Sequence, residues 1–520
     1  MPRTIQIDLT PEQLADAAAV RRAAGATESE PLRIVRRSID CRRRQVIYHL
    51  TVEVGNREQE SGKWKVESGK CCLRQHNFPL STFHSTLVVV GAGPAGLFAA
   101  LRAIELGIRP VIVERGKPVE QRRRDVAALS RCGRLDPESN WCFGEGGAGT
   151  FSDGKLYTRS TKRGDVGAVL QRFVDHGADP DIMVDVHAHI GTDRLPAIIA
   201  RMRDTILAAG GEYHFGQRVA DLLVHGGRAV GVVTADGTEF RGDAIVLATG
   251  HSARDIYSLF QRRGWRLESK PFALGVRVEH PQELINQIQY HGSHYSPLLP
   301  PAAYSLTAQA AGHGVFSFCM CPGGVIVPAA TAPGEQVVNG MSSSHRNSPW
   351  ANSGIAVTVA PDDIGADPAD PLALLDFQRS VETDVFRAVG APNAAPAQRL
   401  VDFIKGRVST SLPRSGFLGS TLSYPLHQLL PPFVVKALQE GFRQFDSRMR
   451  GFVTADALLL AVESRTSSPV RIPRDKETLQ HPQLQGLYPC GEGAGYAGGI
   501  VSSALDGIRC VETISQTFNL

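Results

Sequence analysis

The chain has 520 residues, of which 42% are hydrophobic and 21% are charged. This balance excludes a disordered chain and a collagen-like repeat, and the length predicts roughly three to four folding units. The formal net charge of +4 is too small for the whole molecule to attract polyanions. The excess lies in the first 80 residues, where 14 Lys and Arg residues outnumber 10 Asp and Glu residues.

The cysteines and the N-terminus predict a cytoplasmic protein. The nine cysteines are odd in number and form no CxxC pair, which favours a reducing compartment. The first residues, MPRTIQIDLTPEQ, lack the apolar stretch of a signal peptide. No stretch offers the roughly 20 continuous apolar residues of a membrane helix, so we expect no membrane partner.

The first 80 residues predict a small separate module followed by a polar linker. Residues 5–9 alternate as in a strand, and Thr10 caps a helix that is expected to reach about Gly25. Two further strands are expected over 32–41 and 46–54, which gives the order β-α-β-β. A solvated basic turn between these strands is the favoured interpretation, and nucleic-acid binding is the alternative, through Arg42, Arg43 and Arg44.

A strand, a glycine-rich turn, a helix and a second strand follow one another over residues 87–114. In this arrangement Gly91 makes the tight turn, Gly93 lets pyrophosphate approach the backbone, and Gly96 lets the helix pack on the strand. Glu114, at the end of the second strand, is placed to accept hydrogen bonds from the adenosine ribose. The pattern predicts a dinucleotide site.

Three later segments favour FAD over NAD. The glycine run 144–149 lacks a convincing strand before it and helix after it, so we interpret it as a loop against a flat ring, with a flexible loop as the alternative. A β-meander over 218–241 leads to a buried strand whose small residues at 248–250 allow close passage of a dinucleotide. In the third segment, 491–493, an acid between glycines can bind ribityl hydroxyls, and the following helix can face the flavin N1/O2 edge.

The predicted fold class is α/β, α+β overall. It combines a Rossmann-like FAD-binding domain with a β-meander crossover, an inserted substrate domain with a mixed sheet and helices, and the N-terminal βαββ module. We place the FAD-binding domain at residues 81–264 and 456–520, and the inserted domain at residues 265–455.

Longer motifs resemble a known family. They are similar to motifs of the bacterial family of uncharacterised FAD-dependent dehydrogenases, within the glutathione reductase-like superfamily of two-dinucleotide-motif flavoproteins. The resemblance covers nearly the whole chain and implies flavin and fold rather than a reaction, because the family's substrate is not established. The chain departs from the wider superfamily at Glu492, where Asp is usual. The motifs are GEGGAGTFSDGKL at 144–156, FCMCPGG at 318–324, ESRTSSPVRI at 463–472 and GEGAGYAGGI at 491–500.

The glycine motifs and the resemblance together imply a set of FAD contacts drawn from separate parts of the chain. The expected contacts are Gly91, Gly93, Pro94, Ala95, Gly96, Glu114, Arg115, Gly147, Gly149, Thr150, Val219, Ala248, Thr249, Gly250, Gly491, Glu492, Gly498, Gly499 and Ile500.

Arginines and hydroxyls close to the last flavin segment suggest an anionic substrate. Arg465, Ser467, Ser468 and Arg471 lie within nine residues, and Arg277 lies on an expected strand. Guanidinium groups bind carboxylates and phosphates through two parallel hydrogen bonds. For residues 463–471 the alternative is a structural arginine network that supports the flavin, and for Arg277 it is an ordinary surface position.

No general base stands out from the sequence. Tyr496 and His345 are candidates for a proton relay. Cys319-Met320-Cys321 is not a CxxC dithiol, so we interpret it as packing, and we expect no metal site.

The sequence therefore predicts an FAD-dependent oxidoreductase that transfers hydride between bound flavin and a small-molecule substrate. NADH or NADPH is expected only as a transient electron donor or acceptor, because no second nucleotide domain is apparent. The alternatives are a flavin monooxygenase that uses NAD(P)H and oxygen, and a flavin-containing RNA-binding or redox-sensing protein with little catalysis.

Overall fold

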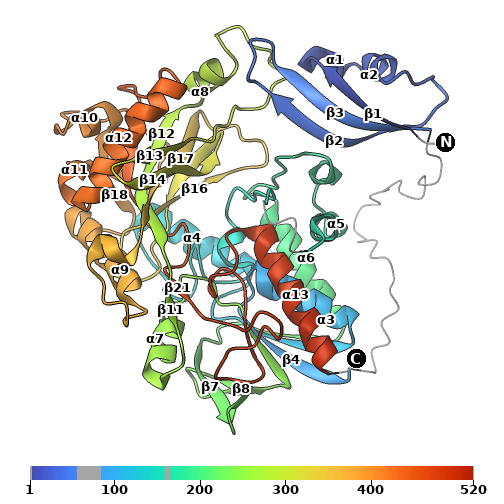
Figure 1. Ribbon diagram of the computed structural model, residues 1–520, viewed down its shortest axis with the longest axis vertical. Helices are drawn as coiled ribbons and strands as arrows, with labels where there is room; N and C mark the ends of the chain where they lie inside the picture. The colour runs from blue at the N-terminus through green and yellow to red at the C-terminus, as the bar shows by residue number, and fades with distance from the viewer. Residues whose placement is uncertain (1–2, 56–82, 159–163, 519–520) are drawn as a thin grey trace.

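The computed structural model describes residues 3–55, 83–158 and 164–518. They form a small N-terminal module, a body around a five-stranded parallel sheet, and a second body around a seven-stranded mixed sheet (Figure 1). This architecture confirms the predicted fold class. The linker expected before residue 81 lies almost entirely outside the described residues. Within the described ranges, no helix is both long and apolar enough to cross a bilayer.

The N-terminal module is an antiparallel sheet in the order β1-β3-β2, covered by two short helices. Alternate residues along β3 are buried and form its core, as the sequence pattern predicts. The expected single helix is interrupted at Asp16, because that side chain accepts a hydrogen bond from the Ala18 N–H and caps a second helix. The elements are β1 (Arg3–Leu9), α1 (Pro11–Ala15), α2 (Ala17–Ala23), β2 (Leu32–Asp40) and β3 (Ile47–Val54).

Arg37 of β2 connects this module to the rest of the molecule. Its backbone N–H donates to the Val184 carbonyl at 2.9 Å. Its guanidinium donates to Asp185 at 2.6 Å and to Asp181 at 2.9 Å. Arg37, one of the basic residues near the hairpin, therefore attaches the module to the rest of the protein. In the turn itself, Arg42 pairs with Asp40.

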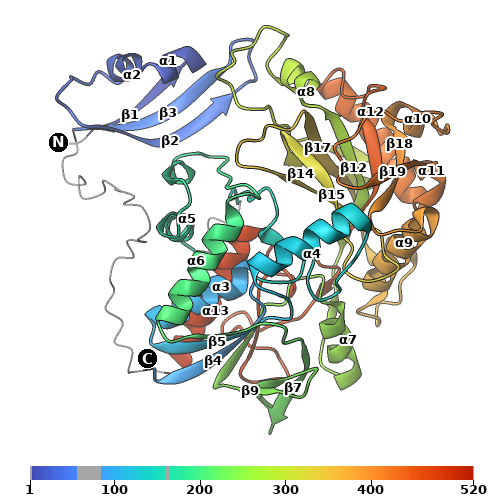
Figure 2. The same cartoon turned by 180° about the vertical axis from the view of Figure 1, so that it is seen from behind.

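The parallel sheet has the order β22-β10-β4-β5-β6 and assembles strands from three distant parts of the chain. Its central strand is buried on both faces, which explains the unbroken valine run. Helices α3 (Pro94–Glu105) and α13 (Ile500–Thr517) pack together on this sheet (Figures 1 and 2). The strands are β4 (Ser85–Val90), β5 (Ile108–Val113), β6 (Glu212–His214), β10 (Ala244–Leu247) and β22 (Leu487–Pro489).

The remaining elements of this body lie between β5 and β12. The predicted meander is present as an antiparallel sheet in the order β7-β8-β9. Helix α4 packs against the β15-β16 hairpin of the second body (Figure 2). The elements are α4 (Val119–Cys132), η2 (Gly147–Gly149), α5 (Val166–Asp175), η4 (Pro180–Met183), α6 (Leu195–Ala208), β7 (Val219–His225), β8 (Arg228–Thr234), β9 (Glu239–Arg241) and α7 (Arg254–Arg263).

The second body is a sheet in the order β13-β14-β17-β12-β20-β18-β19, in which only the β18-β19 pair is parallel. Apolar helix faces pack on it and form a second large core. The elements are β11 (Glu268–Ser269), β12 (Phe272–Pro281), α8 (Gln282–Gln289), β13 (Thr307–Ala310), β14 (His313–Cys321), β15 (Gly324–Pro328), β16 (Val338–Ser342), β17 (Trp350–Val359), η5 (Pro361–Ile364), α9 (Ala373–Val389), β18 (Ala394–Arg399), α10 (Leu400–Ile404), β19 (Ser420–Ser423), α11 (Leu426–Leu429), α12 (Pro432–Arg448), β20 (Leu458–Glu463) and β21 (Val470–Arg471).

Glu279 of β12 makes the stability of this body depend on pH. Burial raises its pKa to about 7, although its two oxygens accept hydrogen bonds from the Gly416 N–H. The unfolded chain therefore loses this proton first, and stability is lost as pH rises from about 4.5 to about 7. Glu279→Gln should flatten this loss by up to about 3 kcal/mol, measured as urea midpoints at pH 5 and pH 8. Parallel pH profiles for the two proteins would contradict the assignment.

Candidate functional site

A cavity of about 720 Å³ lies at the carboxyl ends of β4, β5 and β10. This is the edge where doubly wound sheets bind their ligands. Its wall continues onto β14 and β16 of the second body, so the cavity joins the two bodies. The volume is in the range of ligand pockets. Its walls include residues 90–95, 113–115, 248–253, 490–492 and 498–503.

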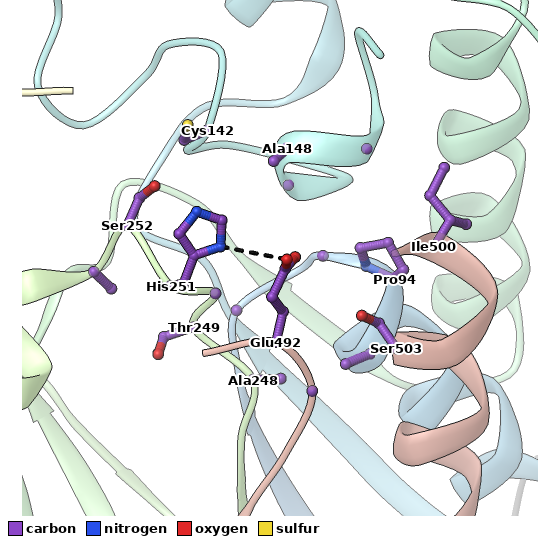
Figure 3. Close-up of a pocket in the computed structure, with 18 of the residues that line it drawn as sticks. Pro94, Cys142, Ala148, Ala248, Thr249, His251, Ser252, Glu492, Ile500 and Ser503 are labelled. Atoms are coloured by element: carbon purple, nitrogen blue, oxygen red, sulfur yellow. Dashed lines mark ion pairs between the residues drawn. The ribbon is translucent and has the colours of Figure 1, made fainter. Parts of the chain in front are cut away.

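Two helices begin at this cavity. Gly93 is the N-cap of α3 and Gly499 is the N-cap of α13, and neither described helix start has a side-chain cap. Figure 3 shows Pro94 of the first helix and Ile500 and Ser503 of the second beside the same space. The free N–H groups and the positive ends of both helix dipoles therefore face the cavity and favour negative charge.

The glycines of the first motif divide into packing and lining positions. A Cβ on Gly91 would lie 2.5 Å from the Ala248 carbonyl oxygen, and one on Gly96 would collide with the Gly91 carbonyl. Gly96 lies outside the cavity wall, as its predicted role in packing requires. A Cβ on Gly93 would have the Gly147 Cα, at 3.9 Å, as its nearest neighbour beyond the adjacent residues. The absent side chain of Gly93 therefore leaves space in the cavity and not in the protein interior.

The glycine pair at the start of α13 likewise leaves space in the cavity. A Cβ on Gly498 or Gly499 would meet nothing within 4 Å, and both residues line the cavity. Together with Gly93, these positions form a cradle that side chains would fill. The cradle and the two uncapped helices suit a group with phosphates and a flat ring, so the residues present fit FAD.

Glu114 has a structural role that the sequence did not reveal. Its carboxylate is 4% exposed and accepts hydrogen bonds from the N–H groups of Ala92 at 2.8 Å, Gly116 at 2.9 Å and Gly144 at 3.0 Å. It therefore joins the two glycine-rich loops. Of these three hydrogen bonds, Oε2 accepts only the one from Ala92. It can therefore accept a further hydrogen bond from a ligand in the cavity, which Glu114 lines.

The second glycine loop is held from behind by a fully buried arginine. Arg122 donates to the carbonyls of Asn140 at 2.8 Å, Trp141 at 3.0 Å and Glu145 at 2.6 Å. It also donates to the Thr150 hydroxyl, which in turn donates to Glu145. Thr150 is buried behind the loop and does not line the cavity, unlike the other loop contacts expected from the sequence, Gly147 and Gly149.

His251 and Glu492 face each other across the cavity floor (Figure 3). His251 Nδ1 lies 3.6 Å from a Glu492 oxygen. The other ring nitrogen, Nε2, is buried and has no hydrogen-bond partner in the described structure. An unpartnered buried nitrogen in a ligand-sized cavity marks a place for a polar ligand atom. The sequence reasoning missed His251, although it directly follows the small-residue strand end.

The predicted substrate residues are mostly committed to structural partners. Arg465 lines the cavity, but its guanidinium binds Glu335 at 2.8 Å and Glu382 at 3.0 Å. Arg277 is fully buried and binds Glu463 at 2.7 Å. Both side chains belong to buried charge networks. For Arg465 this agrees with the structural arginine network, whereas the surface alternative for Arg277 is wrong, because the side chain is fully buried.

The other candidates lie outside the cavity wall. The Ser468 hydroxyl contacts Tyr257 and Val470, and Arg471 lies 3.9 Å from Glu268. The Tyr496 hydroxyl accepts from the Arg474 N–H, and its ring lies under that guanidinium. Ser467 and the exposed His345 also do not line the cavity.

A polar cluster that the sequence reasoning passed over lies on the wall instead. Asp153 and Lys155 follow the second glycine loop. They line the cavity together with Cys319 of β14 and Asn339 of β16. Lys155 Nζ is 3.0 Å from Asp153 and 3.7 Å from the Cys319 sulfur. A lysine two residues after an acid, inside a glycine-rich motif, was the available signal.

One described group has metal-ligand geometry. Single ligand atoms of Cys490, Asp506 and Cys510 lie within 4.8 Å of one another and are buried. Arg474 already supplies the positive charge there, because its guanidinium donates to both Asp506 oxygens, at 2.6 Å and 2.9 Å. We therefore assign this group to packing beneath α13.

Family comparisons agree with this site. Residues 86–127, which contain the first glycine motif, match an FAD binding domain. Residues 271–466 match the family described as "FAD-dependent protein, C-terminal domain-like", and residues 1–55 match a domain of unknown function. With the parallel sheet and the glycine cradle, these matches define an FAD-dependent flavoenzyme fold.

A curated relative covers most of the chain. An uncharacterized protein of Clostridium beijerinckii is 44% identical over 438 residues, which are 83% of this chain and 81% of the relative. The chain belongs to the same family as this clostridial protein.

Two solved structures of other proteins align with the chain at low identity. One is 2,6-dihydroxypyridine-3-hydroxylase from Arthrobacter nicotinovorans, at 12% identity and a TM-score of 0.36, covering 84% of each chain. Another is a geranylgeranyl bacteriochlorophyll reductase-like protein from Thermoplasma acidophilum, at 12% identity and a TM-score of 0.35, covering 84% of this chain and 79% of that one.

Proposed function

We propose that the protein is an FAD-dependent oxidoreductase that transfers hydride between bound flavin and a small-molecule substrate held between the two bodies. The observation that carries the proposal is one continuous cavity wall that runs from the two helix N-termini to Lys155 and Cys319. We further propose that it works in a reducing compartment such as the cytoplasm, since all seven described cysteines are free thiols. Its placement within the glutathione reductase-like superfamily is part of the same proposal.

The chain's residues have distinct tasks in binding FAD. The N–H groups at the start of α3 would hold the pyrophosphate, and Glu114 would accept from the adenosine ribose. Glu492 and the orphaned nitrogen of His251 would bind polar atoms between the two helix ends. Bound FAD supplies a two-electron carrier that takes or gives hydride. The start of α13 would stabilise negative charge on that carrier through its free N–H groups.

The second body supplies the substrate side. Phe318, Cys319, Asn339 and Gly340 extend the cavity wall beyond the glycine cradle. They offer an apolar ring, a thiol and an amide, and Lys155 adds a positive charge. Such a surface can orient a small polar or anionic substrate and hold a proton at the Lys155 amine.

Anaerobic reduction tests the proposal. The purified yellow protein is mixed in a stopped-flow instrument with NADH, NADPH and a panel of small hydroxy, amino and keto acids. We expect at least one compound to bleach the flavin absorbance with saturation kinetics. Flavin that is stably bound but is reduced by none of these donors would favour a redox-sensing or RNA-binding role.

Oxygen uptake distinguishes the monooxygenase alternative. If a substrate stimulates NAD(P)H consumption together with stoichiometric oxygen uptake, the protein is a monooxygenase rather than a dehydrogenase. A dehydrogenase is expected to reduce its flavin with substrate alone and to turn over with an artificial electron acceptor in the absence of oxygen.

A further inference from the structure

Two cysteines interpreted from the sequence as packing lie beside a lysine at the cavity wall. Lys155 Nζ is 3.7 Å from the Cys319 sulfur and 3.6 Å from the Cys321 sulfur. Cys321 is fully buried and donates to the Cys319 carbonyl at 3.3 Å, whereas Cys319 is partly exposed and lines the cavity. The two thiols therefore have an inner and an outer position around one ammonium group.

The backbone directs Cys319 into this position. Its φ of 46° lies in the left-handed region, which is uncommon for a residue other than glycine. The pairing of β14 with β17 shifts register between Phe318 and Cys321, as at a β-bulge. Bulges re-aim side chains, and strained backbone concentrates at functional sites.

The described charged groups around the two sulfurs carry more positive than negative charge. Three cations meet here, because Lys155 and Arg346 both pair with Asp153, and Arg277 pairs with Glu463. Among the described residues, those two carboxylates are the anions paired with the three cations. Two further described titratable groups face the cluster, His189, whose pKa is lowered by burial, and the phenol of Tyr304. The ion pairs thus leave one positive charge beside the sulfurs, and Lys155, whose side chain is 34% exposed on the cavity wall, lies close enough to pair with an ionised thiol.

We propose that Cys319 is a lysine-paired thiolate and a nucleophilic site for small electrophiles that enter the cavity. Lys155 acts as its positioning residue and charge partner, and Cys321 lies behind it and donates to the Cys319 carbonyl. The site goes beyond hydride transfer, because it requires neither flavin reduction nor a known substrate.

The titration behaviour agrees with this geometry. A hydrogen bond from Cys321 and the charges of Lys155 and Arg277 lower the pKa of the Cys319 thiol well below its usual value, against the effect of burial. Burial opposes the charge of Lys155, but the two sulfurs and Asp153 outweigh it and raise the Lys155 pKa. The pKa of Cys321 is raised, so the inner thiol keeps its proton.

The covalent step with a halide probe is simple substitution. The Cys319 sulfur gives its electron pair to the methylene carbon of iodoacetate, an S–C bond forms, the C–I bond breaks, and iodide leaves. No redox partner is consumed. The neutral iodoacetamide reacts by the same substitution, so comparing the two probes measures the effect of the probe's own charge.

Alkylation of the flavin-loaded protein tests the proposal. The protein is incubated with limiting iodoacetate or iodoacetamide from pH 5.5 to 9.5. Peptide mass spectrometry then measures labelling at Cys319, at Cys142 on the same cavity wall and at the exposed Cys132. An ordinary thiol is about 1% ionised at pH 6.5, and lower basicity offsets part of a thiolate's advantage. We expect Cys319 to react at least about tenfold faster than either comparison thiol at pH 6.5.

Variants of Lys155 separate charge from structure. Lys155→Met should slow labelling at Cys319 by about tenfold at pH 6.5 and move its pH profile upward, while Lys155→Arg should keep the fast reaction. Labelling of Cys319 only above pH 8.5, or an unchanged profile in Lys155→Met, would overturn the proposal. Flavin absorbance of the same samples shows separately whether FAD binding holds.

Discussion

Gly93→Val is expected to yield a folded protein that purifies without flavin. Gly93 has φ −73° and ψ −178°, a backbone conformation open to any residue, and a Cβ there would have the Gly147 Cα, at 3.9 Å, as its nearest neighbour beyond the adjacent residues. The substitution therefore adds an isopropyl group to the cavity and not to the protein interior. We expect FAD binding at least tenfold weaker, about 1.4 kcal/mol or more, because the side chain occupies the pyrophosphate path.

Three measurements check this result. The ratio of flavin absorbance to protein absorbance should fall, while circular dichroism stays that of the wild type. Added FAD should raise the melting temperature of wild-type apoprotein but not that of Gly93→Val, because only a ligand that binds the native state stabilises it. Ala168→Val, which places the same valine side chain at an exposed position of α5, is the control. A variant that remains yellow would refute the cradle.

Arg277→Met is expected to destabilise the second body strongly rather than to weaken substrate binding. Arg277 is fully buried and donates to Glu463 at 2.7 Å and to Asn352 at 2.8 Å. Removing the guanidinium leaves the Glu463 carboxylate uncompensated at 2% exposure. Breaking one partner of such a buried pair typically costs about 3–5 kcal/mol, which is read here as a lower urea midpoint.

A paired variant isolates the cause. Arg277→Met combined with Glu463→Leu removes both charges, so it should recover much of the lost stability. If Arg277 bound substrate instead, the single variant would retain its midpoint and raise KM in the flavin-reduction assay. A double variant less stable than the single one would also contradict the ion-pair explanation.

Much of the nucleotide body could be predicted because its signals are local. The register of the valine strand, Gly91, Gly93 and Gly96 depends on contacts within one strand-turn-helix unit. The helix break at Asp16 was missed for an equally local reason, since a capping side chain competed with helix continuation. Helical periodicity alone does not register that competition.

The tasks of the charged residues could not be predicted in the same way. An arginine in a hydroxyl-rich stretch of sequence indicates an anion-binding site as long as its partners are unknown. In the fold, Arg465 binds Glu335 and Glu382, which come from segments about 80 to 130 residues away. The sequence predicts a ribose contact for Glu114, and the folded chain adds three backbone N–H partners that join two loops. Hydrogen-bond capacity is finite, and only the folded chain shows how it is used.

The amino-acid order by itself determined the fold class, the dinucleotide motif and the flavin, since backbone approach needs glycine at set spacings wherever the chain goes. Tertiary structure alone decided which side chains share the cavity. Lys155 and Cys319 are 164 residues apart. Their contact, and the net charge around it, exist only because a loop of the first body packs against a bulged strand of the second.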